Sequence, residues 1–143
     1  MIEKFDYYLK ENLVKRESAD IGEAMSLFKR ARDRLKYIQE QKINEFNSPF
    51  IFENIYECMR EAVQSLMSLR GYKPYSHEVL IAFLKEFYKI KSSDINNFNR
   101  FRMLRNKIVY RAQVVSVEAC KEAFDFLVYF LPLLEKELNK EIK

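Results

Sequence analysis

Glycine and proline are nearly absent from this chain, and that scarcity constrains its fold more than any other feature. The 143 residues include only two glycines and three prolines. A sandwich or barrel of many short strands needs frequent tight turns, which these two residues usually supply. Hydrophobic residues make up 48% of the sequence and twelve residues are Phe, so the chain can bury a core and is not disordered. The sequence therefore predicts an all-α fold.

Apolar residues recur at helical spacing along most of the chain. Pro49 stands at a tolerated first helical position, and Gly71 is a typical residue just past a helix end. Ser76 and Ser116 are candidate N-caps, and Pro132 should kink the last helix because it lacks an amide. The expected helices are 1–15, 21–43, 49–70, 76–88, 92–110 and 117 to the C-terminus.

The predicted architecture is a single up-and-down helical bundle of five to six helices, forming one domain over residues 1–143. Residues 1–16 would be an N-terminal helical extension, and residues 20–138 the core. The segment 49–70 has an unusually wide apolar arc. We therefore expect it to be the central helix, with neighbours on two sides.

Composition also excludes several chemistries. Two cysteines and one histidine cannot build the usual four-ligand zinc sites, and we expect neither a metal nor a cofactor, with an ion bound by carboxylates as the alternative. Cys58 and Cys120 are expected to be buried thiols, with a disulfide or a reactive thiol as the alternatives. No apolar run approaches membrane-spanning length, and the first residues lack the apolar core of a signal peptide. These features predict a cytoplasmic protein that does not associate with membranes.

The segment 98–111 carries the most informative chemistry. On a helical wheel Arg105 falls within the apolar arc of this segment, where an unpaired charge is unfavourable. Arg105 therefore needs a carboxylate, carbonyl groups or an anionic ligand. Pairing with Glu57 or Glu61, or extension of the side chain to solvent, would be purely structural solutions.

The residues Arg-Asn-Lys-Ile-Val-Tyr at 105–110 resemble the signature of HEPN domains, small helical domains of higher eukaryotes and prokaryotes. In that family an Arg is followed four to six residues later by a His. The segment 71–80, Gly-Tyr-Lys-Pro-Tyr-Ser-His-Glu-Val-Leu, also resembles the family's loop after its long central helix. The resemblance covers residues 21–138.

The resemblance implies metal-independent RNA cleavage by an Arg–His pair, but Tyr110 stands at the His position here. A tyrosine side chain, with a reference pKa near ~10, is a poor general base at neutral pH. Ribonuclease activity therefore stays open, with Arg105 and Tyr110 as the catalytic candidates. The implied nucleotide- or RNA-binding residues are Arg102, Arg105, Asn106, Tyr110 and Arg111.

Two function classes follow from the resemblance. The first is a protein that binds RNA or nucleotides, such as the toxin-like component of a toxin–antitoxin pair, with weak or absent ribonuclease activity. The second is a non-catalytic helical interaction module that binds a partner protein such as a nucleotidyltransferase. We expect binding through Arg102, Arg105 and Arg111 to be salt-sensitive, because it would rest on phosphate contacts.

The last helix has a second apolar strip beside its core-facing residues, formed by Phe126, Phe130 and Leu133. This strip predicts a homodimer interface, with burial inside a thick bundle as the alternative. In a dimer with the family geometry, the two 105–110 segments would face each other across a basic cleft.

Two further groups are given structural roles. His77 is expected to make a local hydrogen bond at the start of a helix rather than to act in catalysis. Five basic residues of the second helix are expected to form a solvated face: Lys29, Arg30, Arg32, Arg34 and Lys36.

Overall fold

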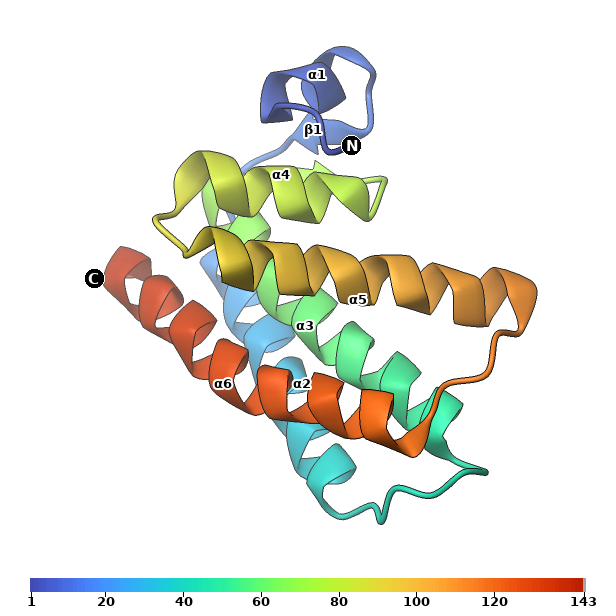
Figure 1. Ribbon diagram of the computed structural model, residues 1–143. Helices are drawn as coiled ribbons and strands as arrows, with labels where there is room; N and C mark the ends of the chain where they lie inside the picture. The colour runs from blue at the N-terminus through green and yellow to red at the C-terminus, as the bar shows by residue number, and fades with distance from the viewer. Residues whose placement is uncertain (143) are drawn as a thin grey trace.

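The computed structural model describes residues 1–142 and shows an all-α bundle with one very small sheet (Figure 1). The predicted fold class is confirmed. Its elements are α1 (Phe5–Lys10), β1 (Val14–Arg16), α2 (Ile21–Gln39), α3 (Ser48–Arg70), β2 (Tyr72–Pro74), α4 (Glu78–Phe87), α5 (Ser92–Arg111) and α6 (Val117–Ile142).

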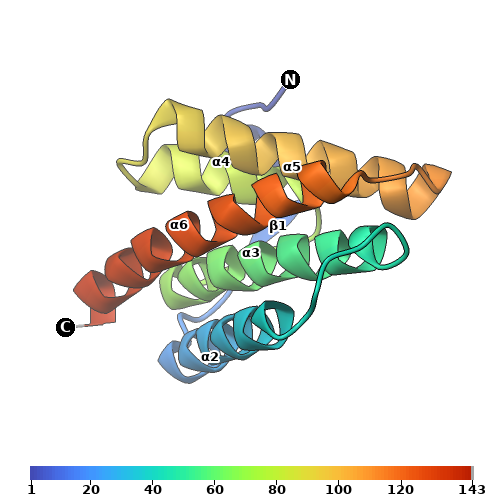
Figure 2. The same cartoon turned by 60° about the horizontal axis from the view of Figure 1, so that its bottom comes forward.

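Helix α3 is the centre of the bundle, as its wide apolar arc predicts. It packs against α2, α4, α5, α6 and β2. Figure 2 shows the helices in three tiers, with α4 and α5 on one side, α3 and α6 in the middle and α2 on the other side. The largest fully buried side chains come from several tiers, and they include Phe28, Phe52, Tyr56, Phe83, Phe98 and Phe130.

The N-terminal segment differs from the expected helix over 1–15. Helix α1 ends at Lys10, Asn12 adopts a left-handed conformation with φ of 59°, and β1 follows. Strand β1 pairs antiparallel with β2, with Lys15 opposite Lys73. Pairing with a segment almost 60 residues away gives the backbone of β1 its hydrogen-bond partners, which a local apolar pattern does not reveal.

Several helix ends match the signals in the sequence. Gly71 follows α3 in the left-handed conformation, with φ of 80°. The hydroxyl of Ser116 accepts a hydrogen bond from the amide of Ala119 at 3.0 Å and caps α6. The hydroxyl of Ser76 accepts one from the amide of Glu78 at 3.2 Å, but the N-cap of α4 is His77, one residue later than expected. Helix α6 continues through Pro132.

Replacing Gly71 with alanine should destabilise the protein substantially. The added Cβ would lie 2.5 Å from the carbonyl oxygen of Glu17, and the left-handed backbone is itself unfavourable for alanine. The left-handed backbone conformation alone costs an alanine about 1–2 kcal/mol of stability. We expect a lower midpoint in chemical denaturation, with Gly22→Ala as control, because the Cβ there meets only an ordinary contact at 3.4 Å. Equal midpoints for the two variants would contradict this prediction.

The apolar strip predicted as a dimer interface lies mostly inside the protomer. Phe130 is fully buried and packs against Phe98 and Phe126, with ring centroids 5.8 and 4.8 Å away. Phe126 and Leu133 are partly buried against the same core. The assignment of Phe130 to an interface is therefore wrong, because α5 crosses over this face of α6 and covers it.

Both cysteines are free and buried, as expected. Burial raises the pKa of Cys58 to about 12 and that of Cys120 to about 11, which keeps both thiols protonated and unreactive at neutral pH. Within residues 1–142, no helix combines the length and the apolar character needed to cross a bilayer.

Candidate functional site

Helix α5 concentrates the positive charge of the protein. Its twenty residues include five basic side chains and one acidic side chain, a formal charge of +4 that equals the net charge of the whole chain. Among the described residues, only Arg100 of these five forms an ion pair, with Glu122 on α6. The basic residues without such a pair are Arg102, Arg105, Lys107 and Arg111.

Arg102 and Arg105 are the unusual members of this group, because both are withdrawn from solvent. Arg102 is only 9% exposed and donates to the side-chain oxygen of Asn99 at 2.9 Å. Arg105 is half-buried, donates to the side chain of Asn106 at 3.3 Å and lies 5.7 Å from the ring centroid of Tyr56. Neither guanidinium faces a carboxylate within ion-pair distance in the part of the chain that the structure describes, so the alternative in which Arg105 pairs with Glu57 or Glu61 is not found.

Tyr56 and His77 share a hydrogen bond next to these arginines. The Tyr56 hydroxyl and His77 Nδ1 are 2.8 Å apart, and the two rings stack with centroids 5.6 Å apart. Burial lowers the pKa of His77, and the nearby charges of Arg105 and Arg60 lower it further. His77 is therefore neutral at pH 7, and its hydrogen bond is to Tyr56 of α3 rather than to a neighbour in the sequence as expected.

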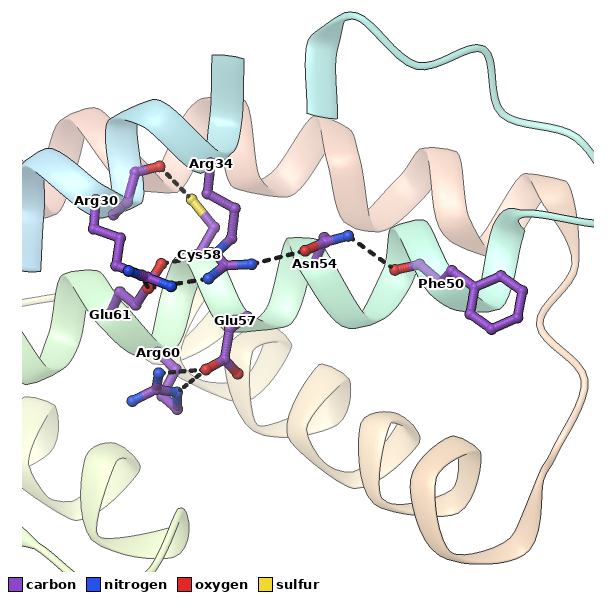
Figure 3. A network of polar contacts seen from close by, with 9 residues as sticks. Arg30, Arg34, Phe50, Asn54, Glu57, Cys58, Arg60 and Glu61 are labelled. Atoms are coloured by element: carbon purple, nitrogen blue, oxygen red, sulfur yellow. Dashed lines mark hydrogen bonds and ion pairs between the residues drawn. The ribbon is translucent and has the colours of Figure 1, made fainter. Parts of the chain in front are cut away.

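The acids that could have neutralised Arg105 are held by other arginines. Figure 3 shows Glu61 of α3 between Arg30 and Arg34 of α2. The Arg34 Nε donates to Glu61 at 2.9 Å and the Arg30 Nε donates at 2.8 Å, while Glu57 pairs with Arg60 one turn away on α3. Four of the five basic residues of α2 are exposed, as expected, and only Arg34 is partly withdrawn from solvent.

Two hollows lie along one side of α3. The first, which we call the Arg105 hollow, is lined by Arg34, Phe50, Glu53, Asn54, Glu57 and Arg105. The second, which we call the ribbon pocket, lies between α3 and the β2–α4 loop and is lined by Arg60, Gln64, Pro74, Tyr75, Ser76, His77 and Leu80. The α3 residues of both hollows fall every three or four positions from 50 to 64, so they follow one line along the helix.

The remaining predicted site residues lie further along α5. Tyr110 is 74% exposed and Arg111 is exposed, beyond the end of the Arg105 hollow. Five residues on a helix separate side chains by about 7.5 Å along the axis and roughly 140° around it. Within one protomer, α5 therefore does not bring Arg105 and Tyr110 together, whereas Arg105 and Asn106 are in contact.

Sequence reasoning missed the contributions of Tyr56, Arg60 and Gln64. A signal was available, because polar residues recur at helical spacing within the otherwise very apolar segment that forms α3. Polar positions in a central helix mark the stripe that no neighbouring helix covers. What the sequence could not show is that His77, almost 30 residues from Arg105, lies beside the same tyrosine.

Comparison with known proteins adds no relative: no family model matches the chain, and no curated protein or solved structure matches it either.

Proposed function

We propose that this chain is a HEPN-like protein that binds RNA or nucleotides through α5 and cleaves RNA weakly or not at all. One observation carries the proposal: α5 holds a formal charge of +4, and two of its arginines are withdrawn from solvent without a carboxylate partner among the described residues. Such guanidinium groups favour an anionic ligand, because an uncompensated charge in a low-dielectric site is costly.

A phosphate group suits these residues well. Guanidinium groups bind phosphate oxygens through paired hydrogen bonds, and Arg105 stands at the edge of a hollow where a ligand can approach it. Arg111 and Lys107 extend the positive surface toward the end of α5. Because Lys107 and Arg111 lie roughly 160° and 120° around α5 from Arg105, a single strand would meet all of these charges only by wrapping around the end of the helix.

The chemistry of the site favours binding over cleavage. An exposed tyrosine hydroxyl can donate a hydrogen bond or stack on a base, yet it accepts protons poorly at neutral pH. The neutral His77 has one ring nitrogen committed to Tyr56. General acid–base assistance contributes roughly 10²–10⁴-fold to such reactions, so its absence should leave little turnover.

Fluorescence anisotropy with a labelled single-stranded octa-adenylate RNA tests the proposal. Arg105→Ala should weaken binding roughly 10- to 100-fold, since a charged hydrogen bond contributes about 1.5–3 kcal/mol. It should also reduce the salt slope of the affinity by roughly one, because one phosphate contact is lost.

Lys36→Ala is the matched control, since Lys36 is an exposed cation on α2, in the tier opposite α5 (Figure 2). It should leave the affinity nearly unchanged. Rapid metal-independent cleavage by the wild type, abolished by Tyr110→Phe or His77→Ala, would contradict the proposed lack of turnover.

A second candidate function is favoured by a different observation. Apolar side chains are exposed around the end of α5, where Val109, Tyr110 and Val114 are 40%, 74% and 85% exposed. This end suits an interaction module that binds a second copy of the chain or a partner such as a nucleotidyltransferase. Absence of RNA affinity at low salt, with a dimer detected by sedimentation, would favour this function.

A further inference from the structure

Gln64, one of the residues that line the ribbon pocket, carries a buried polar atom without a partner. The side-chain oxygen of Gln64 is inaccessible to solvent and has no hydrogen-bond partner among the described residues. Leaving such an acceptor unsatisfied is unfavourable, so a ligand N–H group becomes a favourable partner if the Gln64 side chain turns to expose this oxygen to the pocket. Pro74 and Leu80 give the same pocket apolar walls.

An aromatic ring surrounded by positive charge stands at the mouth of this pocket. Tyr75 is 52% exposed, and the ammonium groups of Lys15 and Lys73 lie 5.3 and 5.7 Å from its ring centroid. Both lysines are exposed, and they are direct partners in the β1–β2 register. The Tyr75 amide also donates to the carbonyl of Leu13 at 2.8 Å, which fixes the ring to the ribbon.

These features together fit a nucleotide. A ring face beside flexible cations is the combination that single-stranded RNA recognition uses, with the base on the ring and the cations on phosphates. Lysine ammonium groups on long side chains can leave the ring face for a phosphate when a base stacks there. Arg60 of α3, which also pairs with Glu57, and the neutral His77 line the same pocket and offer further donors to a phosphate or ribose oxygen.

We propose that the ribbon pocket binds one nucleotide of the RNA, with the base stacked on Tyr75 and, once the Gln64 side chain turns toward the pocket, a base N–H donated to its side-chain oxygen. The inference rests on the proposed function, because it assigns a base-binding pocket for the same RNA that α5 holds by its phosphates. Every natural base carries an N–H group, so the pocket should accept any of the four bases without preferring one of them.

The test uses the full chain and the labelled octa-adenylate RNA, with Tyr75→Ala, Gln64→Leu and the control Tyr37→Ala. Tyr37 is 55% exposed at the end of α2, so its loss removes an aromatic ring away from the pocket. Tyr75→Ala should weaken binding roughly tenfold, as expected for the loss of one stacked base. Gln64→Leu should weaken it roughly fivefold, and Tyr37→Ala should leave it unchanged.

Thermal unfolding separates this role of Gln64 from a structural one. Removing an acceptor that the protein leaves unsatisfied should keep or raise the unfolding temperature of Gln64→Leu. If Gln64→Leu instead lowers the unfolding temperature and leaves the affinity unchanged, Gln64 serves the fold through bound water and the inference is overturned.

Competition with free AMP identifies the form of the ligand. If AMP displaces the RNA from the wild type but not from Tyr75→Ala, the pocket also accepts free nucleotides. If the pocket variants bind RNA more weakly but AMP does not displace it, the pocket recognises a nucleotide only within a strand. Unchanged affinity of both pocket variants, beside a loss in Arg105→Ala, would overturn the inference and leave the proposed function intact. Absence of RNA and AMP binding by the wild type would overturn both.

Discussion

Replacing Phe130 with alanine should lower the free energy of unfolding by about 3–5 kcal/mol, the usual cost of removing a buried phenylalanine ring. Phe130 is fully buried between Phe98 of α5 and Phe126 of α6. The cavity left by its ring would lie where the two helices meet, in a rigid part of the bundle that relaxes only partly. Chemical denaturation followed by circular dichroism measures the effect.

Phe46→Ala is the matched control, because it removes the same ring from a side chain that is 82% exposed. Its effect should stay within about 0.5 kcal/mol. A Phe130→Ala protein as stable as the wild type but altered in oligomeric state would contradict the burial of this ring and restore an interface role.

Replacing Glu61 with alanine should cost about 3 kcal/mol of stability, at the lower end of the range for breaking a buried ion pair. The Glu61 side chain is 2% exposed, and it accepts hydrogen bonds from both Arg30 and Arg34. Arg34, with 21% of its side chain exposed, would lose the partner that raises its pKa. The stability cost of Glu61→Ala stays at this lower end because Arg34 can still turn part of its charge to water.

Arg30→Ala separates the two arginines, since 70% of the Arg30 side chain is exposed and such pairs contribute only about 0–1 kcal/mol. Arg34→Ala should cost more, because it leaves the buried carboxylate with a single exposed partner. A double-mutant cycle between positions 34 and 61 measures the coupling directly. If Arg30→Ala and Arg34→Ala lose the same free energy of unfolding, burial does not determine which of the two ion pairs with Glu61 is stronger.

The helices were predictable because their signals are local. Apolar spacing locates α2 through α6, and Gly71 and Ser116 mark ends that depend on a few neighbouring residues. Strands β1 and β2 were not predictable, since each has only three residues and the partner lies far away in the sequence. The burial of Phe130 depends on which face of α6 is crossed by α5, and helical periodicity does not specify that choice.

The site was predictable only in part, and for a related reason. The helical wheel of segment 98–111 places Arg105 within the apolar arc, and the structure shows it as a half-buried guanidinium over Tyr56. Whether Arg105 has a carboxylate partner depends on which arginines lie closest to the acids in the folded protein. Arg34 and Arg60 reach the acids Glu61 and Glu57 first, and no local rule ranks four arginines for two carboxylates.

The pairing of β1 with β2 also sets an order of assembly. Phe5 packs against Tyr72, Phe83 and Phe87, so the first sixteen residues find their partners only after α4 has been synthesised. At roughly 5–20 residues per second, a growing chain would carry this segment unpaired for several seconds. Closing so long a loop adds little entropic cost once the α2–α3 hairpin has brought its ends together. Residues 1–16 therefore cannot make their native contacts before the chain has been synthesised through α4.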